Sequence, residues 1–204
     1  MKKLELYFDE ELQGKFELKK LNLLLVFQVN CPGCFSYALP VFNRLYEQWN
    51  NGDISFLALS TAFEDFDRNT EENTQRLVKE GFLVGETKRF MAQQGFEELP
   101  YSLDFPVAMD KIEKELPDLD RILDNICSST PGFDTLPEFE KVSYRNRVAA
   151  YLNSLEKTAL TFTLNGLRGT PSFVLFNSDY DILSHWFGHV HYENIENAIN
   201  KFSE

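Results

Sequence analysis

The sequence has no long apolar run, few cysteines and a minority of basic residues. Its longest apolar stretch, residues 21–29, is interrupted by Asn22 and Gln28 and is far shorter than the ~20 residues that a membrane-spanning helix needs. Near the N-terminus, Glu5 and Asp9 stand where a signal peptide requires uninterrupted apolar residues. We therefore expect no membrane partner and no export signal.

Basic residues number 20 against 32 acidic ones, which gives a net charge of -12. Such a charge repels the phosphate backbone of nucleic acids and the surface of anionic membranes. Nucleic acid is therefore excluded as an expected partner, and solubility is the simplest role of the charge. With 204 residues, 43% of them hydrophobic, the chain can form one domain with a large core and an insertion.

Only three cysteines occur, and an odd number does not make the disulfide framework of a small secreted protein. Two of them, Cys31 and Cys34, form a Cys-Pro-Gly-Cys motif between an apolar run and an amphipathic segment. This context is typical of a redox motif in a reducing compartment. We therefore expect a cytoplasmic protein.

The pattern of apolar residues predicts an α/β domain with a mixed central sheet flanked by helices and with a helical insertion. Nearly continuous apolar runs indicate buried strands, and spacings of three and four indicate helices. The first strand, helix and strand should form a parallel pair with a right-handed crossover, and Pro40 should kink the helix. The predicted strands are 21–30, 54–61, 105–109, 171–176 and 182–187, and the predicted helical segments are 35–49, 69–95, 111–165 and 192–202. Within residues 1–204 we expect a single domain, in which residues 112–158 are the insertion.

The position of Cys31 at a predicted helix start favours ionisation of its thiol. Free backbone N–H groups and the positive end of the helix dipole stabilise a thiolate there. Cys34 lies one helical turn further on, close enough to form a disulfide with Cys31 or to resolve a mixed disulfide. The position of Cys31 thus favours the thiolate of that residue, and the spacing of the motif places the Cys34 thiol within its reach.

Cys31 and Cys34 could also be zinc ligands or inert core residues. A zinc site needs a second pair of ligands, and only His185, His189 and His191 are candidates. Inert core cysteines are the other alternative, but two thiols around Pro-Gly at a helix start are not a packing pattern. Neither alternative accounts for the motif as well as redox chemistry does.

Four segments of the chain resemble the thioredoxin-fold superfamily, in particular its TlpA-like and redoxin-like branch. They are VFQVNCPGCFSYALP, FLALSTAFEDF, FPVAMD and LRGTPSFVLFNSDYDILSHWFGHV. The resemblance implies a thioredoxin-like fold with a cis-proline at Pro171. It also implies that Pro32, Gly33, Thr170, Pro171 and Gly188 lie where a substrate docks, and that the backbone of Thr170 pairs with a bound peptide.

Two departures from the family pattern concern the motif itself. Asn30 replaces the tryptophan that usually precedes the first cysteine, and the dipeptide is Pro-Gly rather than Gly-Pro. Because the motif and its surroundings tune thiol pKa and redox poise, these departures affect the direction of the reaction more than its type.

Thiol–disulfide exchange is the function that these features favour, with Cys31 as the nucleophile and Cys34 as the resolving thiol. The partners would be a protein or small-molecule disulfide and an electron-donating thiol reductant, and no cofactor or metal is expected. A peroxiredoxin-like thiol peroxidase is an alternative, but Gln28 and Leu24 stand where that family has threonine and proline. A redox-inactive binding protein, the third class, would be expected to have lost a cysteine.

Three further features of the sequence each allow a structural and a functional interpretation. Cys127 falls on the apolar face of a predicted helix, which favours a buried structural cysteine over a third redox thiol. His189, beside Gly188, is a candidate to stabilise the Cys31 thiolate, although a solvated loop histidine is the simpler expectation. The acidic insertion is expected to be a solvated helix face, and it could also cap the active-site side.

Overall fold

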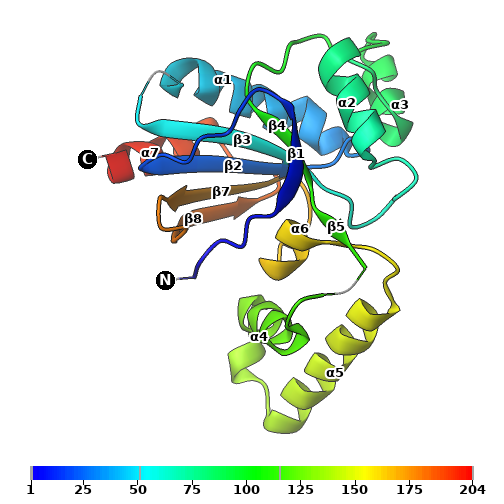
Figure 1. Ribbon diagram of the computed structural model, residues 1–204, viewed down its shortest axis with the longest axis vertical. Coiled ribbons are helices and arrows are strands. Elements are labelled where there is room, and N and C mark those ends of the chain that lie inside the picture. Colours follow the sequence, from blue (N-terminus) through cyan, green and yellow to red (C-terminus); the bar gives the residue numbers. More distant parts are fainter. Residues whose placement is uncertain (1, 51, 115, 204) are drawn as a thin grey trace.

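The computed structural model describes residues 2–50, 52–114 and 116–203, and a six-stranded mixed sheet runs through its centre (Figure 1). The strand order is β1-β4-β3-β2-β7-β8. Strands β2, β3 and β4 are parallel, whereas β1, β7 and β8 join antiparallel. The strands are β1 (Phe8–Gln13), β2 (Leu21–Phe27), β3 (Ile54–Ser60), β4 (Val107–Asp110), β7 (Ser172–Asn177) and β8 (Ile182–Phe187). The predicted mixed α/β fold and the parallel first pair are confirmed.

Every residue of the central strand β2 is buried, because both faces of the sheet are covered. Successive side chains of a strand point to opposite faces. Accordingly, Leu23 and Leu25 belong to the larger core cluster, and Leu24 and Val26 belong to a second cluster on the other face. The continuous apolar run in the sequence thus reflects two separate cores.

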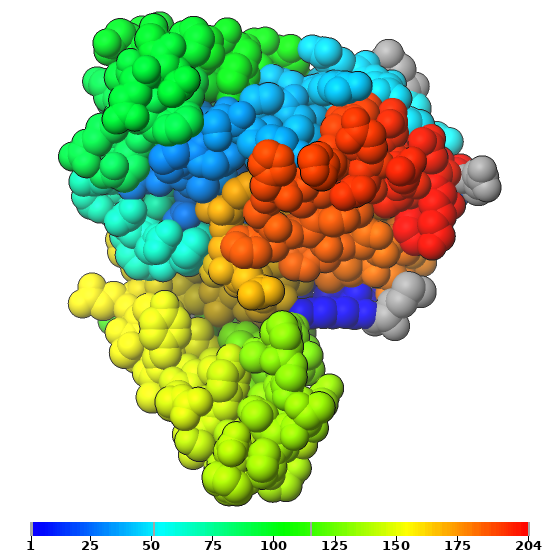
Figure 2. Space-filling model, turned by 180° about the vertical axis from the view of Figure 1, so that it is seen from behind, coloured from blue at the N-terminus to red at the C-terminus, as the bar shows by residue number. Residues whose placement is uncertain are grey.

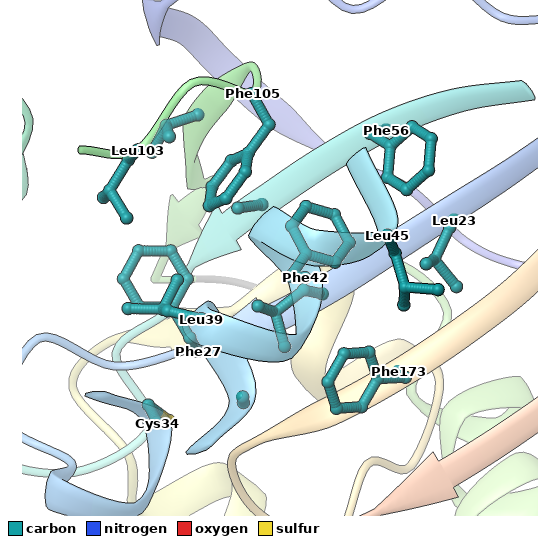
Figure 3. Packing of buried hydrophobic residues seen from close by; sticks show 14 of the residues in the cluster. Leu23, Phe27, Cys34, Leu39, Phe42, Leu45, Phe56, Leu103, Phe105 and Phe173 are labelled. Carbon is teal, nitrogen blue, oxygen red and sulfur yellow. The ribbon is translucent and has the colours of Figure 1, made fainter. Parts of the chain in front are cut away.

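Two helices cover the face of the larger core, α1 (Leu39–Trp49) and α7 (Tyr192–Ser203). Helices α2 (Glu71–Glu80) and α3 (Gly85–Gln93) follow β3 and extend the same core beyond the end of the sheet (Figure 1). Phe42 of α1 lies at its centre, with its ring between those of Phe105, Phe56 and Phe173 (Figure 3). These contacts fix α1, and therefore its first turn, against the sheet.

The helix that follows the cysteine motif does not begin as a regular α-helix. Its first part is a π-helical turn, η1 (Cys34–Ala38), in which the N–H of Leu39 donates to the carbonyl oxygen of Cys34. Pro40 has no N–H, so it cannot donate to a carbonyl of the preceding turn. The hydroxyl of Tyr101 donates instead to the carbonyl oxygen of Phe35 at 2.6 Å. A π-turn thus precedes Pro40, and Pro40 itself lies in the first turn of α1 rather than in the interior of a helix.

Residues 111–114 and 116–118 do not form the helix that the sequence predicted. Residues Ile112–Glu113 are a short strand, β5, which pairs antiparallel with β6 (Thr158–Ala159), also inside the predicted helical region. Pro117 prevents an earlier helix start, and α4 (Leu119–Ser129) begins beyond it with Asp118 as its N-cap. Residue 115 lies outside the described residues.

Between β5 and β6 the chain projects from the main body as a helical pair (Figures 1 and 2). It consists of α4, the single turn η2 (Phe133–Thr135) and α5 (Glu138–Ser154), and α6 (Leu160–Leu164) leads back to the sheet. The helices share a small core of their own, which includes Ile122, Leu152 and Leu160. The segment therefore packs largely on itself.

Strand β1 was not predicted, because the acidic residues of FDEELQ hide its weak alternation. It pairs with β4 at the edge of the sheet, and charged side chains are common on edge strands because they discourage further pairing. Among the described residues, every helix is too short or too polar to cross a membrane.

The packing of Phe42 gives a test of the core. Replacing this fully buried residue in Phe42→Ala removes its aromatic contacts and leaves a cavity, so the free energy of unfolding should fall by about 3–5 kcal/mol. Urea unfolding of the reduced protein measures this change. The matched control Phe139→Ala, at a side chain that is 73% exposed on α5, should change it by less than about 0.5 kcal/mol. Equal effects would contradict this description of the core.

Candidate active site

The two motif cysteines lie where β2 passes into the helix. Cys31 Sγ and Cys34 Sγ are 2.9 Å apart, and the Cys34 thiol is the donor. The N–H of Cys34 donates to the carbonyl oxygen of Cys31, which closes the first turn around Pro32 and Gly33. Cys31 is partly exposed, whereas Cys34 is buried in the larger core. The two sulfurs therefore touch but differ in their access to solvent.

This geometry separates the pKa values of the two thiols. The hydrogen bond from the Cys34 thiol, together with the N–H groups of Cys34 and Gly33, lowers the pKa of Cys31 to about 6 against the opposing effect of burial. Complete burial, and then the neighbouring Cys31, raise the pKa of Cys34 well above its ordinary value. At neutral pH Cys31 is thus mostly a thiolate and Cys34 is a thiol.

The loop before β7 lies against the exposed sulfur. Its Thr170-Pro171 peptide bond is cis, as the resemblance to the thioredoxin-fold superfamily implied. The carbonyl oxygen of Thr170 is 3.7 Å from Cys31 Sγ and accepts from the thiol form. Gly188, with a φ of 77°, donates its N–H to the carbonyl oxygen of Pro171, and a Cβ there would meet no atom within 4 Å. Of the predicted site residues, Cys31 thus contacts Thr170, and Pro171, which is buried, contacts Gly188.

Gln28 is a member of the site that sequence reasoning did not assign. Its Oε1 accepts from the hydroxyl of Thr170 at 3.0 Å, while its buried Nε2 has no hydrogen-bond partner among the described residues. Thr170 lowers the pKa of Cys31, so Gln28 contacts a residue that acts directly on the exposed thiol.

Asn30 holds the other side of the motif in place. Its N–H donates to Asn69 at 3.0 Å, its Nδ2 donates to Asp65 at 2.7 Å, and its Oδ1 accepts the N–H of Glu86 at the start of α3. At Gly85 a Cβ would lie 2.1 Å from Asn30 Oδ1, so this close contact requires glycine. The residue that departs from the family's tryptophan thus links the motif to α3 through hydrogen bonds.

The histidines occupy other positions. His189 stacks on Tyr37 of η1 with ring centroids 3.5 Å apart, and no hydrogen bond found in the described part of the chain joins it to a sulfur. His185 lies on β8, and desolvation of its ring, followed by the nearby charge of Lys2, lowers its pKa. No group of three or more His, Cys, Asp or Glu side chains able to hold a metal ion is found among the described residues.

Cys127 lies in α4, far along the chain from the motif, and is buried with 3% of its surface exposed. Burial raises the pKa of its thiol, which keeps it protonated and unreactive at neutral pH. The predicted buried cysteine on a helix face is confirmed.

Comparison with known proteins identifies the fold of the chain. No protein-family model and no curated protein sequence matches the chain. Among solved structures, a protein described as a thioredoxin-like superfamily protein is 18% identical, with a TM-score of 0.58 over 99% of this chain and 97% of its own. A thiol-disulfide isomerase from Corynebacterium glutamicum is 20% identical, with a TM-score of 0.54 over 98% and 95%. The chain therefore has a thioredoxin-like fold over nearly its whole length.

The separation of the two pKa values can be measured directly. Thiolate absorbance at 240 nm in the reduced protein should rise in a single-thiol step with a midpoint near pH 6, because the thiolate of Cys31 is stabilised by its hydrogen-bond donors. Cys31→Ser should remove this step, and the control Cys127→Ser should keep it. A first step near the ordinary pKa of 9.0 would contradict the described electrostatics.

The contact between Gln28 and Thr170 predicts a smaller effect on the same titration. Thr170→Val removes a group that lowers the pKa of Cys31, so this variant should raise that pKa. Gln28→Leu frees the Thr170 hydroxyl from Gln28 Oε1 for donation to the thiolate, so it should lower the pKa. The double variant should behave like Thr170→Val, because Gln28 acts only through that hydroxyl. Gln94→Leu, at an exposed position at the end of α3, is the control and should leave the pKa unchanged.

Proposed function

We propose that this chain with a thioredoxin-like fold is a thiol–disulfide oxidoreductase in which Cys31 is the nucleophile and Cys34 the resolving thiol. One observation supports it above the others. A partly exposed sulfur whose pKa is lowered to about 6 lies 2.9 Å from a fully buried sulfur whose pKa is raised. The first can attack a docked disulfide, and the second is shielded until the first has reacted.

The reaction begins at the exposed sulfur. The Cys31 thiolate attacks one sulfur of the substrate disulfide, so that a mixed disulfide forms and the other substrate sulfur leaves as a thiolate. This step removes the negative charge from Cys31, and with it one of the causes that raise the pKa of Cys34. Resolution thus becomes easier only after the attack.

Cys34 completes the exchange. Its proton passes to the first substrate thiolate, and its sulfur attacks Cys31 Sγ, which forms the Cys31–Cys34 bond and releases the second substrate sulfur as a thiolate. Two electrons have then moved from the cysteine pair to the substrate. A thiol reductant returns them by the same exchange in reverse, so the cycle needs no bound cofactor.

The substrate in this proposal docks against the open surface beside Cys31. Pro32 and Gly33 border it on one side, and the Thr170-Pro171 loop and Gly188 border it on the other. An extended segment there would pair with the backbone of Thr170, as in β-strand addition. We further propose a reducing, cytoplasmic setting, in which the pair works as a reductase.

The experiment equilibrates the protein across glutathione redox buffers and reads the Cys31–Cys34 state by thiol alkylation. We expect a reversible two-electron transition. A Cys31 pKa of about 6 lies between those of thioredoxin and DsbA, so the midpoint should fall between roughly -270 mV and roughly -120 mV. Cys127→Ser, the control, should show the same midpoint. If no Cys31–Cys34 disulfide forms at any ratio of reduced to oxidised glutathione, the proposal is wrong.

A further inference from the structure

A cavity of about 460 Å³ is enclosed by the projecting helices and by the segments that join them to the sheet. Its walls come from α4, α5 and α6 and from Phe63, which follows β3. The rings of Phe63 and Phe162 stack in its lining, with centroids 4.0 Å apart. The volume is within the range of small-molecule sites in proteins, about 300–1,000 Å³.

The cavity exists because two cores meet there without filling the space between them. Leu152 and Leu155 of the wall belong to the core of the projecting helices, whereas Phe162 and Leu167 pack against the second core of the sheet. Apolar side chains that face an unfilled space lose the dispersion contacts that a close-packed interior supplies. An apolar molecule of suitable size would restore those contacts.

The charge of the lining is the reverse of the charge of the protein. The chain carries 32 acidic and 20 basic residues, yet the lining contains Arg168 and Lys157 and no Asp or Glu. Both cations are exposed, and neither forms an ion pair with a carboxylate of residues 2–50, 52–114 or 116–203. The apolar cavity therefore has a positively charged rim in an acidic protein.

We propose that this cavity binds a small amphipathic carboxylic acid, with its apolar body between the two cores and its carboxylate at the cationic rim. The guanidinium of Arg168 offers the planar pair of donors that matches a carboxylate. Lys157 also borders a second hollow, which Asp110 and Glu113 help to line, so Arg168 is the main contact in this proposal.

The cavity is a separate site from the cysteine pair, but the two are joined by a short piece of chain. Arg168 is followed by Gly169 and then by Thr170, whose carbonyl oxygen faces Cys31 Sγ. At Gly169 a Cβ would lie 2.8 Å from the ring of Phe187, so this connection is closely packed against β8. Ligand binding at the rim does not require either motif cysteine.

The test uses decanoate as the probe, below its micelle concentration, with isothermal titration calorimetry on the full chain. Wild-type protein should bind one equivalent. Arg168→Ala should weaken binding on the order of tenfold and Lys157→Ala by less, because a charge-assisted contact is lost in each. Thr163→Trp, which fills the cavity without changing a charge, should abolish binding. Arg89→Ala, an exposed arginine on α3, is the control and should bind like the wild type.

Other probes separate recognition of the acid from simple apolar binding. Decanol and decyltrimethylammonium should bind far more weakly than decanoate, because they lack the negative charge. The proposal is overturned if wild-type protein shows no saturable binding of decanoate. It is also overturned if decanol binds as well as decanoate, or if Arg168→Ala binds like the wild type. The Cys31→Ser variant should bind decanoate normally even if the proposed redox function fails.

Discussion

The contact between the two motif sulfurs is the interaction on which the rest of the site depends. It joins a partly exposed sulfur to a buried one at 2.9 Å, and a hydrogen bond between them favours the thiolate on the exposed side. Without the burial of Cys34 the two thiols would compete for the same role. In the proposed exchange, the buried thiol acts first as a hydrogen-bond donor and later as the attacking group. Stabilisation of the Cys31 thiolate also stabilises the reduced form, which makes the pair a weaker reductant than a pair of ordinary thiols.

The surrounding fold maintains this asymmetry from several directions. The aromatic cluster around Phe42 holds α1 against the sheet, and the π-turn before it brings Cys34 into the core. Tyr101 satisfies the carbonyl oxygen of Phe35 in the turn where Pro40 has no N–H to offer. Asn30, on the other side, joins the motif to α3. The position of Cys31 is therefore set by contacts with segments distant in the sequence.

Much of this could be predicted from the sequence, because the strongest signals are local. The apolar runs 21–29 and 54–61 gave the parallel core strands, and the Cys-Pro-Gly-Cys motif with Thr170-Pro171 located the site. Strands β1, β5 and β6 were missed, since short or charged strands depend on partners that the local pattern does not reveal. The helix predicted from residue 111 was wrong, because Pro117 is incompatible with a helix interior and the helix begins only beyond it.

The contributions of Gln28 and Asn30 to the site could not be predicted from the sequence, because each depends on contacts between residues that are distant in the chain. Gln28 reaches Thr170 across 142 positions, and Asn30 reaches Glu86 across 56. The cavity beside Arg168 is of the same kind, since it arises where two separately packed cores meet. In each case the residue types were visible in the sequence, but their juxtaposition was not.

The most direct test of the account is to find which sulfur carries a trapped substrate. Reduced Cys34→Ser protein would be reacted with a disulfide-linked model peptide, quenched in acid and mapped by mass spectrometry. The account predicts one peptide attached to Cys31, no adduct at Cys127, and no stable adduct in the matched Cys31→Ser variant. An adduct formed mainly on Cys34 in Cys31→Ser, at a rate equal to that at Cys31, would contradict the assigned roles.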